Sequence, residues 1–262
     1  MKIGFIQFHP EFGKKEKNVE KAVGIIRDID ADLIVLPELF NSGYLFTSAE
    51  EVENISEDVP SGYTTQSLLH VAKDTDTFIV AGLAEKAEGA RYNSAVLLGP
   101  EGFVGLYRKA HLFKDEVKWF EKGDTGFNVH DIGLARIGMM ICFDWIFPEA
   151  ARTLALKGAD IICHPSNLML PFCQKAMITR SLENGVFSLT CNRVGVEERG
   201  GERLEFTGLS QIVDPKGNVL ALASEDEEGT QVVEIDPMEA RDKTVGINKI
   251  FQERRTDLYE LS

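Results

Sequence analysis

The sequence lacks long apolar runs and has fewer basic than acidic residues, and each shortage excludes a class of protein. Its longest hydrophobic stretches fall well short of the roughly 20 residues that a membrane-spanning helix needs, so we expect no membrane partner. The 28 Lys and Arg residues are outnumbered by 42 Asp and Glu, for a net charge of −14. Such an acidic surface repels phosphates, so we also expect no nucleic-acid partner.

The cysteines lack the spacing of a redox pair or a metal site. There are only four, at positions 142, 163, 173 and 191, and none forms a Cys-x-x-Cys motif. No histidine pair has zinc-ligand spacing either. We therefore expect free thiols, no bound metal and a reducing environment. The first residues run directly into a strand-like segment without a secretory signal pattern, which favours a cytoplasmic location.

Apolar strands and amphipathic helices fill most of the chain. The predicted strands are Lys2–Phe8, Asp32–Glu38, Thr77–Glu85, Tyr92–Leu98, Phe103–Tyr107, Ile137–Ile141, Ala159–Ser166, Val186–Asn192, Phe206–Val213, Val219–Ala223 and Gln231–Ile235. The predicted helices are Lys15–Asp28, Thr64–Lys73, Pro148–Leu156, Gln174–Asn184 and a short one at Pro237–Lys243. This α/β pattern indicates sheets that pack on each other with helices outside. No linker divides residues 1–262, so we expect a single domain, with residues 244–262 as an arm.

Two of these strands resemble each other. Asp32–Glu38 and Asp160–Ser166 each follow a helix, and each ends in proline plus a polar residue. We infer two related α/β halves. If the halves are pseudo-symmetric, Glu38 and Ser166 emerge at the same edge of the structure.

Cys142 follows the short apolar strand Ile137–Ile141 and precedes Pro148-Glu149, a pair that starts helices. The turn between a strand and a helix holds a side chain rigidly. A nearby helix N-terminus lowers the pKa of a thiol, and the thiolate is the nucleophile of cysteine enzymes. Most free cysteines are small buried hydrophobic residues instead, and this stretch alone favours neither interpretation.

Three charged residues are candidates to work with such a nucleophile. Glu38 ends a buried strand, where a carboxylate is held dry, with a raised pKa suited to a general base. Lys109 follows the strand Phe103–Tyr107, and a fixed ammonium stabilises an oxyanion, although a solvated charge is the commoner fate of an Arg-Lys pair. Glu116 lies in an aromatic stretch and is a possible second carboxylate, but spacing alone does not distinguish it from a surface acid.

Three motifs together carry a resemblance to a known family. They are Leu36–Phe40 (LPELF), Tyr107–Leu112 (YRKAHL) and Ile141–Asp144 (ICFD). In order and spacing they are similar to the signature regions of the nitrilase superfamily, also called carbon–nitrogen hydrolases. The similarity extends to the segments HPSN at 164–167 and RSLEN at 180–184, and spans the chain from the first strand to Ile235.

The resemblance implies a four-layer α-β-β-α sandwich that assembles as a homodimer or a multiple of one, without a cofactor. It implies a catalytic triad of Glu38, Lys109 and Cys142, with Glu116 as an accessory acid. The backbone N–H of Phe143 would stabilise the oxyanion beside Lys109. For the pair Arg180–Glu183 we prefer a structural ion pair on a helix to a role in the chemistry.

The residues that follow Cys142 bear on the choice of substrate. Family nitrilases tend to carry Cys-Trp-Glu where this chain has Cys142-Phe143-Asp144, so we expect an aliphatic amide or an ω-amide. Phe143 has a smaller ring than Trp, and the roomier wall that it leaves beside the reacting carbon would suit a planar amide. Nitriles and carbamoyl amines stay open as alternatives, as does a binding protein that has lost its chemistry. Candidate pocket residues are Tyr44, Asn167 and Phe172, with Phe40 and Trp145, although the aromatic ones equally suit a core or a dimer contact.

Overall fold

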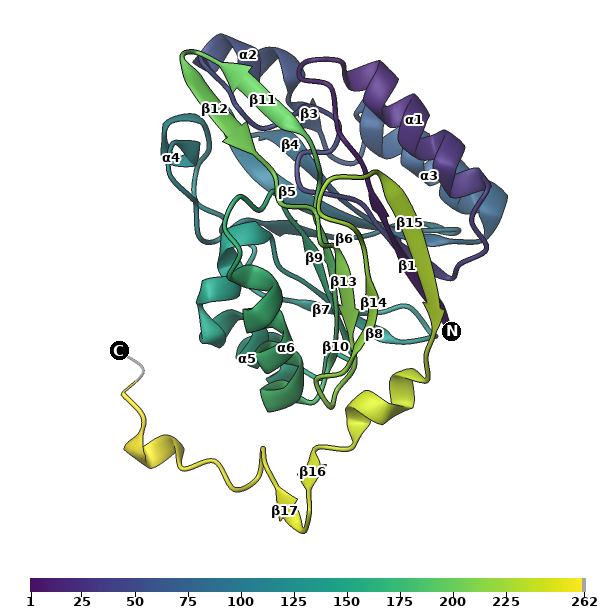
Figure 1. Cartoon of the computed structure of the whole chain (residues 1–262), viewed down its shortest axis with the longest axis vertical. Coiled ribbons are helices and arrows are strands. Elements are labelled where there is room, and N and C mark those ends of the chain that lie inside the picture. Colours follow the sequence, from purple (N-terminus) through teal and green to yellow (C-terminus); the bar gives the residue numbers. More distant parts are fainter. Residues whose placement is uncertain (261–262) are drawn as a thin grey trace.

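Two β-sheets packed face to face form the centre of the computed structural model, which describes residues 1–260 (Figure 1). The first sheet has seven strands in the order β15-β1-β2-β4-β5-β6, with β3 paired to β4. Its strands are β1 (Lys2–Gln7), β2 (Leu33–Val35), β3 (Glu57–Asp58), β4 (Phe78–Ala87), β5 (Ala90–Gly99), β6 (Gly102–Arg108) and β15 (Gly229–Glu234). Strands β1, β2 and β4 run parallel, whereas β5, β6 and β15 join antiparallel.

The second sheet has six strands and repeats this plan. Its order is β14-β13-β10-β9-β8-β7, with a parallel centre of β8, β9 and β10. Its strands are β7 (Val129–Asp131), β8 (Arg136–Met139), β9 (Ile161–Pro165), β10 (Phe187–Cys191), β13 (Gln211–Val213) and β14 (Val219–Leu222). Because β2 and β9 occupy matching places in the two parallel centres, the two related halves expected from the sequence are present.

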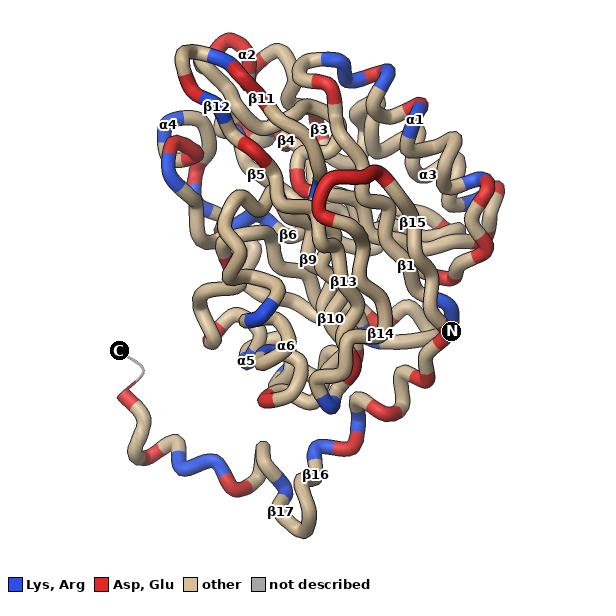
Figure 2. The backbone as a smooth tube through the Cα atoms, in the orientation of Figure 1, with Lys and Arg blue, Asp and Glu red and all other residues tan. Residues whose placement is uncertain are grey.

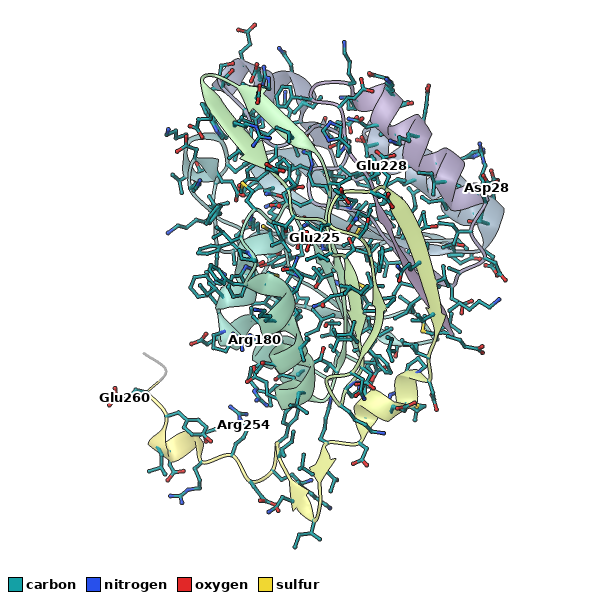
Figure 3. All side chains as sticks on the ribbon, in the orientation of Figure 1. Asp28, Arg180, Glu225, Glu228, Arg254 and Glu260 are labelled. Carbon is teal, nitrogen blue, oxygen red and sulfur yellow. The ribbon has the colours of Figure 1, made fainter. Side chains whose placement is uncertain are left out.

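Helices cover the outer face of each sheet. On the first sheet lie α1 (Lys15–Arg27) and α3 (Tyr63–Thr75), and on the second lie α5 (Pro148–Leu156) and α6 (Cys173–Asn184) (Figure 1). The layers are therefore α-β-β-α, as the sequence predicted. Arg180 lies on α6 (Figure 3). Its guanidinium pairs with Glu183 at 3.0 Å, so the predicted ion pair of that helix is also present.

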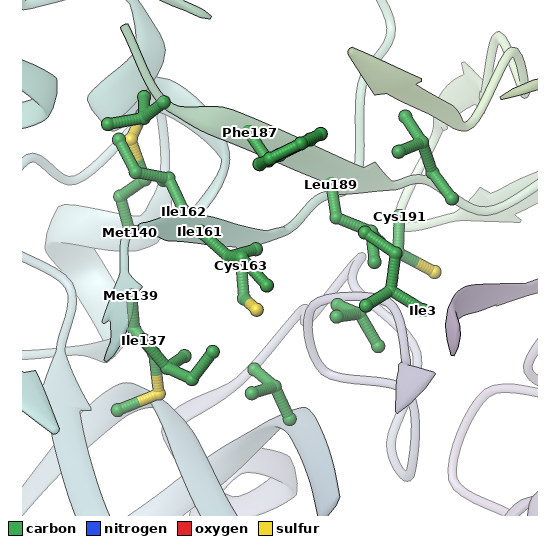
Figure 4. Packing of buried hydrophobic residues seen from close by; sticks show 14 of the residues in the cluster. Ile3, Ile137, Met139, Met140, Ile161, Ile162, Cys163, Phe187, Leu189 and Cys191 are labelled. Atoms are coloured by element: carbon green, nitrogen blue, oxygen red, sulfur yellow. The ribbon is translucent and has the colours of Figure 1, made fainter. Parts of the chain in front are cut away.

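Alternation along the strands explains why the layers hold together. In β2, Leu33 and Val35 point into the core between the sheets, while Ile34 packs under the helices. Fully burying one such aliphatic side chain contributes about 1.5–3 kcal/mol. Cys163 on β9 lies in the inter-sheet core among Ile161 and Leu189 (Figure 4). Cys173 is fully buried in the same cluster.

Two predicted elements differ in the structure. The strand expected over Phe206–Val213 is confined to β13, because Gly208 and Leu209 have left-handed backbones with φ near +54° that break the extended run. A hairpin of β11 (Val196–Arg199) and β12 (Glu202–Glu205) was missed. Its strands are mostly polar and lack clear alternation, so only the Gly-Gly pair at the turn marked it.

Other short elements lie between these strands. The long segment after Glu38 contains α2 (Ala49–Ile55), whose N-cap Ser48 accepts a hydrogen bond from the Glu51 N–H. The irregular stretch before β7 contains α4 (Glu116–Trp119), and the short helix after β15 is the 3₁₀ turn η2 (Pro237–Arg241).

Charged residues lie mainly on the outside of the sandwich, and the loop 225–228 between β14 and β15 forms a continuous acidic run (Figure 2). Beyond η2, β16 (Thr244–Val245), β17 (Asn248–Lys249) and the 3₁₀ turn η3 (Thr256–Leu258) extend away from the sandwich (Figure 1). Residues 261–262 of the predicted arm lie outside the described residues, and the homodimer stays a prediction. None of the helices formed by residues 1–260 is long and apolar enough to cross a membrane.

Candidate active site

Both sheets contribute to one buried site. Glu38 follows β2 and Lys109 follows β6 in the first sheet, whereas Cys142 follows β8 in the second. Asn167, just after β9, connects the two sides. Its side-chain amide donates to the Glu38 backbone oxygen at 3.0 Å, and its own backbone oxygen lies 3.7 Å from the Cys142 sulfur. The two matching strand ends therefore meet, as the pseudo-symmetry predicted.

Lys109 lies between two buried carboxylates. Its Nζ is 2.7 Å from Glu38 Oε1 and 2.7 Å from Glu116 Oε1. Burial alone would lower the pKa of Lys109, but the charges of Glu116 and Glu38 outweigh it and raise that pKa, so the ammonium stays charged. An ammonium has three N–H donors, so one remains after these two bonds. That donor is available to a third oxygen.

The two oxygens of Glu38 have different surroundings. Oε1 accepts hydrogen bonds from Lys109 and, at 2.6 Å, from the Asn93 side-chain amide on β5. Oε2 is buried and has no hydrogen-bond partner among residues 1–260. Such an unpaired buried acceptor costs folding free energy. It is also an acceptor that is free to take a proton from a reacting group.

Glu116 is held from three sides. Besides Lys109, the Tyr44 hydroxyl donates to Oε1 at 2.7 Å and the Phe113 N–H donates to Oε2 at 3.1 Å. Burial raises the pKa of Glu116, Lys109 lowers it in part, and the nearby charge of Glu38 raises it again. The carboxyl of Glu116 is thus placed to share or hold a proton next to Lys109.

Cys142 occupies a strained turn with φ of +41°, a region that side chains other than glycine rarely adopt. It begins the 3₁₀ turn η1 (Cys142–Ile146), which separates β8 from helix α5. Asp144 closes the turn by accepting bonds from the Ile141 N–H at 2.8 Å and the Tyr107 hydroxyl at 2.7 Å. The His111 ring lies 2.7 Å from the same carboxylate.

A second histidine fixes the backbone of Cys142 from the other side. His164 is fully buried, and burial lowers its pKa to about 4, so the ring is neutral at pH 7. Its Nε2 lies 2.9 Å from the Cys142 backbone oxygen and its Nδ1 lies 3.1 Å from Thr190 Oγ1. A neutral ring satisfies both contacts by donating from Nε2 and accepting at Nδ1. The turn at Cys142 is therefore rigid before any ligand binds.

A cavity of about 220 Å³ opens beside the Cys142 sulfur. It is lined by Phe113, Cys142, Phe143, Trp145, Ile146, Asn167, Leu168, Met169, Leu170 and Phe172. The structure thus places Asn167 and Phe172 at the cavity, as predicted, together with Trp145. Phe40 is instead packed in the core between the helices and the first sheet. The first N–H groups of a helical turn have no partner within it, which leaves that of Phe143 available beside the sulfur.

Tyr44 is not among the residues that line this cavity. It lines a separate space of about 430 Å³ and directs its hydroxyl at Glu116. Tyr44 therefore contacts the carboxylate cluster rather than the space beside the sulfur. Asp144 is also absent from the cavity wall, because one of its oxygens accepts the Ile141 N–H of the turn and the other accepts the His111 N–H. The shorter acid at position 144 therefore does not widen the space for a substrate.

The chain matches the family model described as "Carbon-nitrogen hydrolase" over residues 2–243. The chain belongs to this family. A protein named nitrilase from Pyrococcus abyssi is 50% identical over 263 residues, covering 99% of each chain. An (R)-stereoselective amidase from a Pseudomonas species is 36% identical over 241 residues, covering 90% of this chain and 85% of its own.

A solved carbon–nitrogen hydrolase from Helicobacter pylori has the same fold, with a TM-score of 0.88 at 27% identity over 99% of this chain and 96% of that one. The protein is thus a carbon–nitrogen hydrolase of the nitrilase superfamily, as the sequence motifs predicted. Within residues 1–260, no three His, Cys, Asp or Glu side chains gather where they would hold a metal ion. At this site Lys109 occupies the space between the two carboxylates.

The electrostatics of this hydrolase correct one expectation. A lowered thiol pKa was expected from the helix that follows Cys142. Instead, burial and the nearby Glu38 carboxylate raise the pKa of the Cys142 thiol, and Lys109 offsets this only in part. A raised pKa favours the protonated thiol at neutral pH.

Chemical labelling tests this inference. Cys142 is 5% exposed at the cavity, while the other three cysteines are fully buried. We expect iodoacetamide to label Cys142 first. Because a higher pKa means less thiolate at a given pH, the labelling rate should keep rising past pH 9, the ordinary value for a thiol. Peptide mass spectrometry at several pH values measures this. A plateau below pH 9, or faster labelling of Cys163 or Cys191, would contradict it.

Several residues of the site were missed as contributors. Asn93 lies in the polar first half of β5, between Arg91 and Ser94, and its side chain holds the Glu38 carboxylate. Tyr107, His111 and Asp144 belong to the sequence motifs, but nothing in the sequence indicates that they bond one another. Because its neighbours in β5 are also polar, nothing in the sequence singles out Asn93.

Proposed function

We propose that this hydrolase cleaves the C–N bond of a primary amide with an apolar acyl group, through a thioester on Cys142. The observation that carries the proposal is the buried, unpaired Oε2 of Glu38 in a site whose thiol is protonated at rest. A free acceptor and a neutral thiol are the two reactants of a base-assisted nucleophilic attack.

In the first half-reaction, Glu38 takes the proton from the Cys142 sulfur as the sulfur attacks the amide carbon. The carbonyl oxygen becomes an oxyanion, which accepts the remaining N–H of Lys109 and the N–H of Phe143. Glu38 then passes its proton to the amide nitrogen. The C–N bond breaks, ammonia leaves, and the acyl group stays on sulfur as a thioester.

In the second half-reaction, water replaces ammonia. Glu38 removes a proton from the water as its oxygen attacks the thioester carbon, and the same two donors stabilise the oxyanion. The C–S bond breaks, the sulfur regains its proton from Glu38, and a carboxylic acid leaves. Glu116 keeps Lys109 in place through both steps by its 2.7 Å contact.

The lining of the cavity supports an apolar acyl group. Of the ten residues around the sulfur, eight are large hydrophobic side chains and none is Lys, Arg, His, Asp or Glu. A distal carboxylate of an ω-amide would meet no cation in this lining, and the ammonium of a carbamoyl amine would meet no acid. Placing an unpaired charge against apolar walls is costly, so both alternatives fit less well than an uncharged chain.

Asn167 supports an amide over a nitrile. Its Nδ2 donates to the Glu38 backbone oxygen, which fixes the orientation of the side chain. Its Oδ1 is buried and has no hydrogen-bond partner among residues 1–260. Asn167 lines the cavity beside Cys142. An amide NH₂ group offers a donor to such an acceptor and a nitrile offers none, so the amide satisfies a group that a nitrile leaves unpaired.

A nitrile is the second candidate, because the relative of 50% identity is named nitrilase. The test compares matched substrates: butyramide, butyronitrile and succinamic acid share a four-carbon skeleton. We expect kcat/KM for butyramide to exceed that for each of the other two at least tenfold, which is about 1.4 kcal/mol in the transition state.

Ammonia release is measured for all three substrates, with a carbamoyl amine as a fourth. A tenfold preference for butyronitrile would make the chain a nitrilase and leave the proposed nucleophile and base unchanged. A preference for succinamic acid would contradict the apolar acyl site. No ammonia from any substrate would favour the binding-protein alternative.

A further inference from the structure

A buried ion pair lies beside the site without entering the chemistry proposed above. Arg193 follows β10, and Glu197 lies on β11. Their side chains are 0% and 4% exposed, and Arg193 Nη1 donates to Glu197 Oε1. Removing two charges from water is costly, and a buried pair of this kind is weak evidence for added stability. The contacts of the pair indicate another role.

Glu197 holds the main chain of the loop that carries Tyr44. Its oxygens accept the Tyr44 N–H at 3.1 and 3.2 Å and the Leu45 N–H at 2.7 Å. The preceding Gly43 has a φ of +83°, and a Cβ on it would meet Glu197 and Phe12 at 3.0 Å or less. The loop is thus pressed against the carboxylate at a point where only glycine fits.

Arg193 holds the ring of the same tyrosine through a second residue. Its guanidinium stacks over the Phe206 ring at 4.1 Å, and the Phe206 ring meets the Tyr44 ring edge to face at 6.0 Å. Arg193 also donates to the backbone oxygen of Pro10 at 3.3 Å, which anchors the guanidinium itself. Both the main chain and the ring of Tyr44 are therefore fixed by one ion pair.

Tyr44 carries this order into the site. Its hydroxyl donates to Glu116 at 2.7 Å, and the same Glu116 oxygen contacts Lys109 at 2.7 Å. We propose that Arg193 and Glu197 are positioning residues, which orient Glu116 and Lys109 for the reaction by fixing Tyr44. The proposal rests on the hydrolase chemistry above. It predicts that the pair acts on the rate of reaction and not on the cavity in which the acyl group binds.

The variant Glu197→Gln tests this. A glutamine keeps the shape but has one acceptor oxygen where the loop uses two. We expect kcat to fall about 10- to 100-fold, the effect of a catalytic group displaced by about 1 Å. The KM should change less than threefold, because neither Glu197 nor Tyr44 lines the cavity beside Cys142.

Asp160→Asn is the matched control. Asp160 is a buried carboxylate that also accepts a backbone N–H, from Arg136 at 2.9 Å, and pairs with an arginine, Arg241, at 2.9 Å. It immediately precedes β9, whereas the site lies beyond the other end of that strand. Asp160→Asn should lower the unfolding temperature and leave kcat unchanged. If this control lost as much kcat, a general loss of stability would explain the effect of Glu197→Gln, and the proposal would be overturned.

A double-mutant cycle with Tyr44→Phe identifies the route. If Glu197 acts through the tyrosine hydroxyl, Tyr44→Phe lowers kcat by a similar factor and the double variant loses little more than either single one. Additive losses, or wild-type kcat in Glu197→Gln, would overturn the proposal. If Glu197→Gln does not fold, Arg193→Met combined with Glu197→Gln takes its place, because it leaves no unpaired buried charge.

The cycle uses whichever substrate the wild-type chain hydrolyses fastest. A wrong choice between amide and nitrile therefore leaves this test intact. A wild-type chain that hydrolyses none of them contradicts the proposed function itself, which separates the two failures. An active wild type with an unaffected Glu197→Gln variant contradicts only the positioning role.

Discussion

The Cys142→Ala variant is expected to fold normally and to lose essentially all turnover. Without the sulfur there is no atom to form the thioester, and removing the nucleophile of a hydrolase lowers kcat by about 10⁶-fold. The fold should persist because the backbone contacts of the turn remain: His164 still reaches the backbone oxygen and Asp144 still accepts the Ile141 N–H. Ammonia release and circular dichroism measure the two properties.

Cys163→Ala is the control for this loss. Cys163 is a second buried cysteine of the second sheet, but it lies within β9, in the inter-sheet core. We expect a modest loss of stability, about 1 kcal/mol for a small core truncation, with kcat retained. Turnover by Cys142→Ala, or its loss in a folded Cys163→Ala, would place the nucleophile elsewhere.

The Glu38→Gln variant is expected to accumulate an acyl thioester. Glutamine keeps the bulk of the side chain, and its oxygen can still accept from Asn93, but it takes no proton from water. Losing a general base typically costs 10²- to 10⁴-fold. Because water is a poorer nucleophile than a thiol, deacylation should suffer more than acylation. Intact-protein mass spectrometry after mixing with amide detects the adduct.

Glu57→Gln provides the comparison for Glu38→Gln. Glu57 is another buried carboxylate near the first sheet, with contacts to Lys15 at 3.3 Å and to the Thr64 N–H. Its variant should lose stability without forming an adduct. Wild-type turnover by Glu38→Gln would show that the proposed base is the wrong residue.

Much of the fold could be predicted from the sequence because its central strands are short and apolar. Runs such as the one ending at Val35 need cover on both faces, which indicates helices outside two sheets. The hairpin of β11 and β12 could not be predicted, because Glu and Arg occupy most of its positions and leave no apolar alternation. What fixes that hairpin is distant in sequence: Arg199 bonds the Leu45 oxygen and Glu51.

The sequence predicted those site residues that follow a strand. It did not predict contacts between residues that meet across the two sheets. Glu38, Lys109 and Cys142 each follow a strand and were predicted. The hydroxyl of Tyr44 reaches Glu116, 72 residues away, and its target follows from packing alone. The prediction of a lowered pKa for the Cys142 thiol was wrong for the same reason. Burial and a carboxylate distant in sequence raise this pKa by more than the local helix lowers it.

The proposed base and the proposed nucleophile belong to different sheets, and this has a consequence for how the protein gains its activity. Neither half of the chain can hold a complete site: the first would carry a carboxylate and an ammonium without a thiol, and the second a thiol without a base. The contact between Asn167 and the Glu38 backbone forms only when the sheets dock. Turnover therefore reports that the two sheets have docked, and a chain with complete secondary structure but separated sheets would be chemically silent.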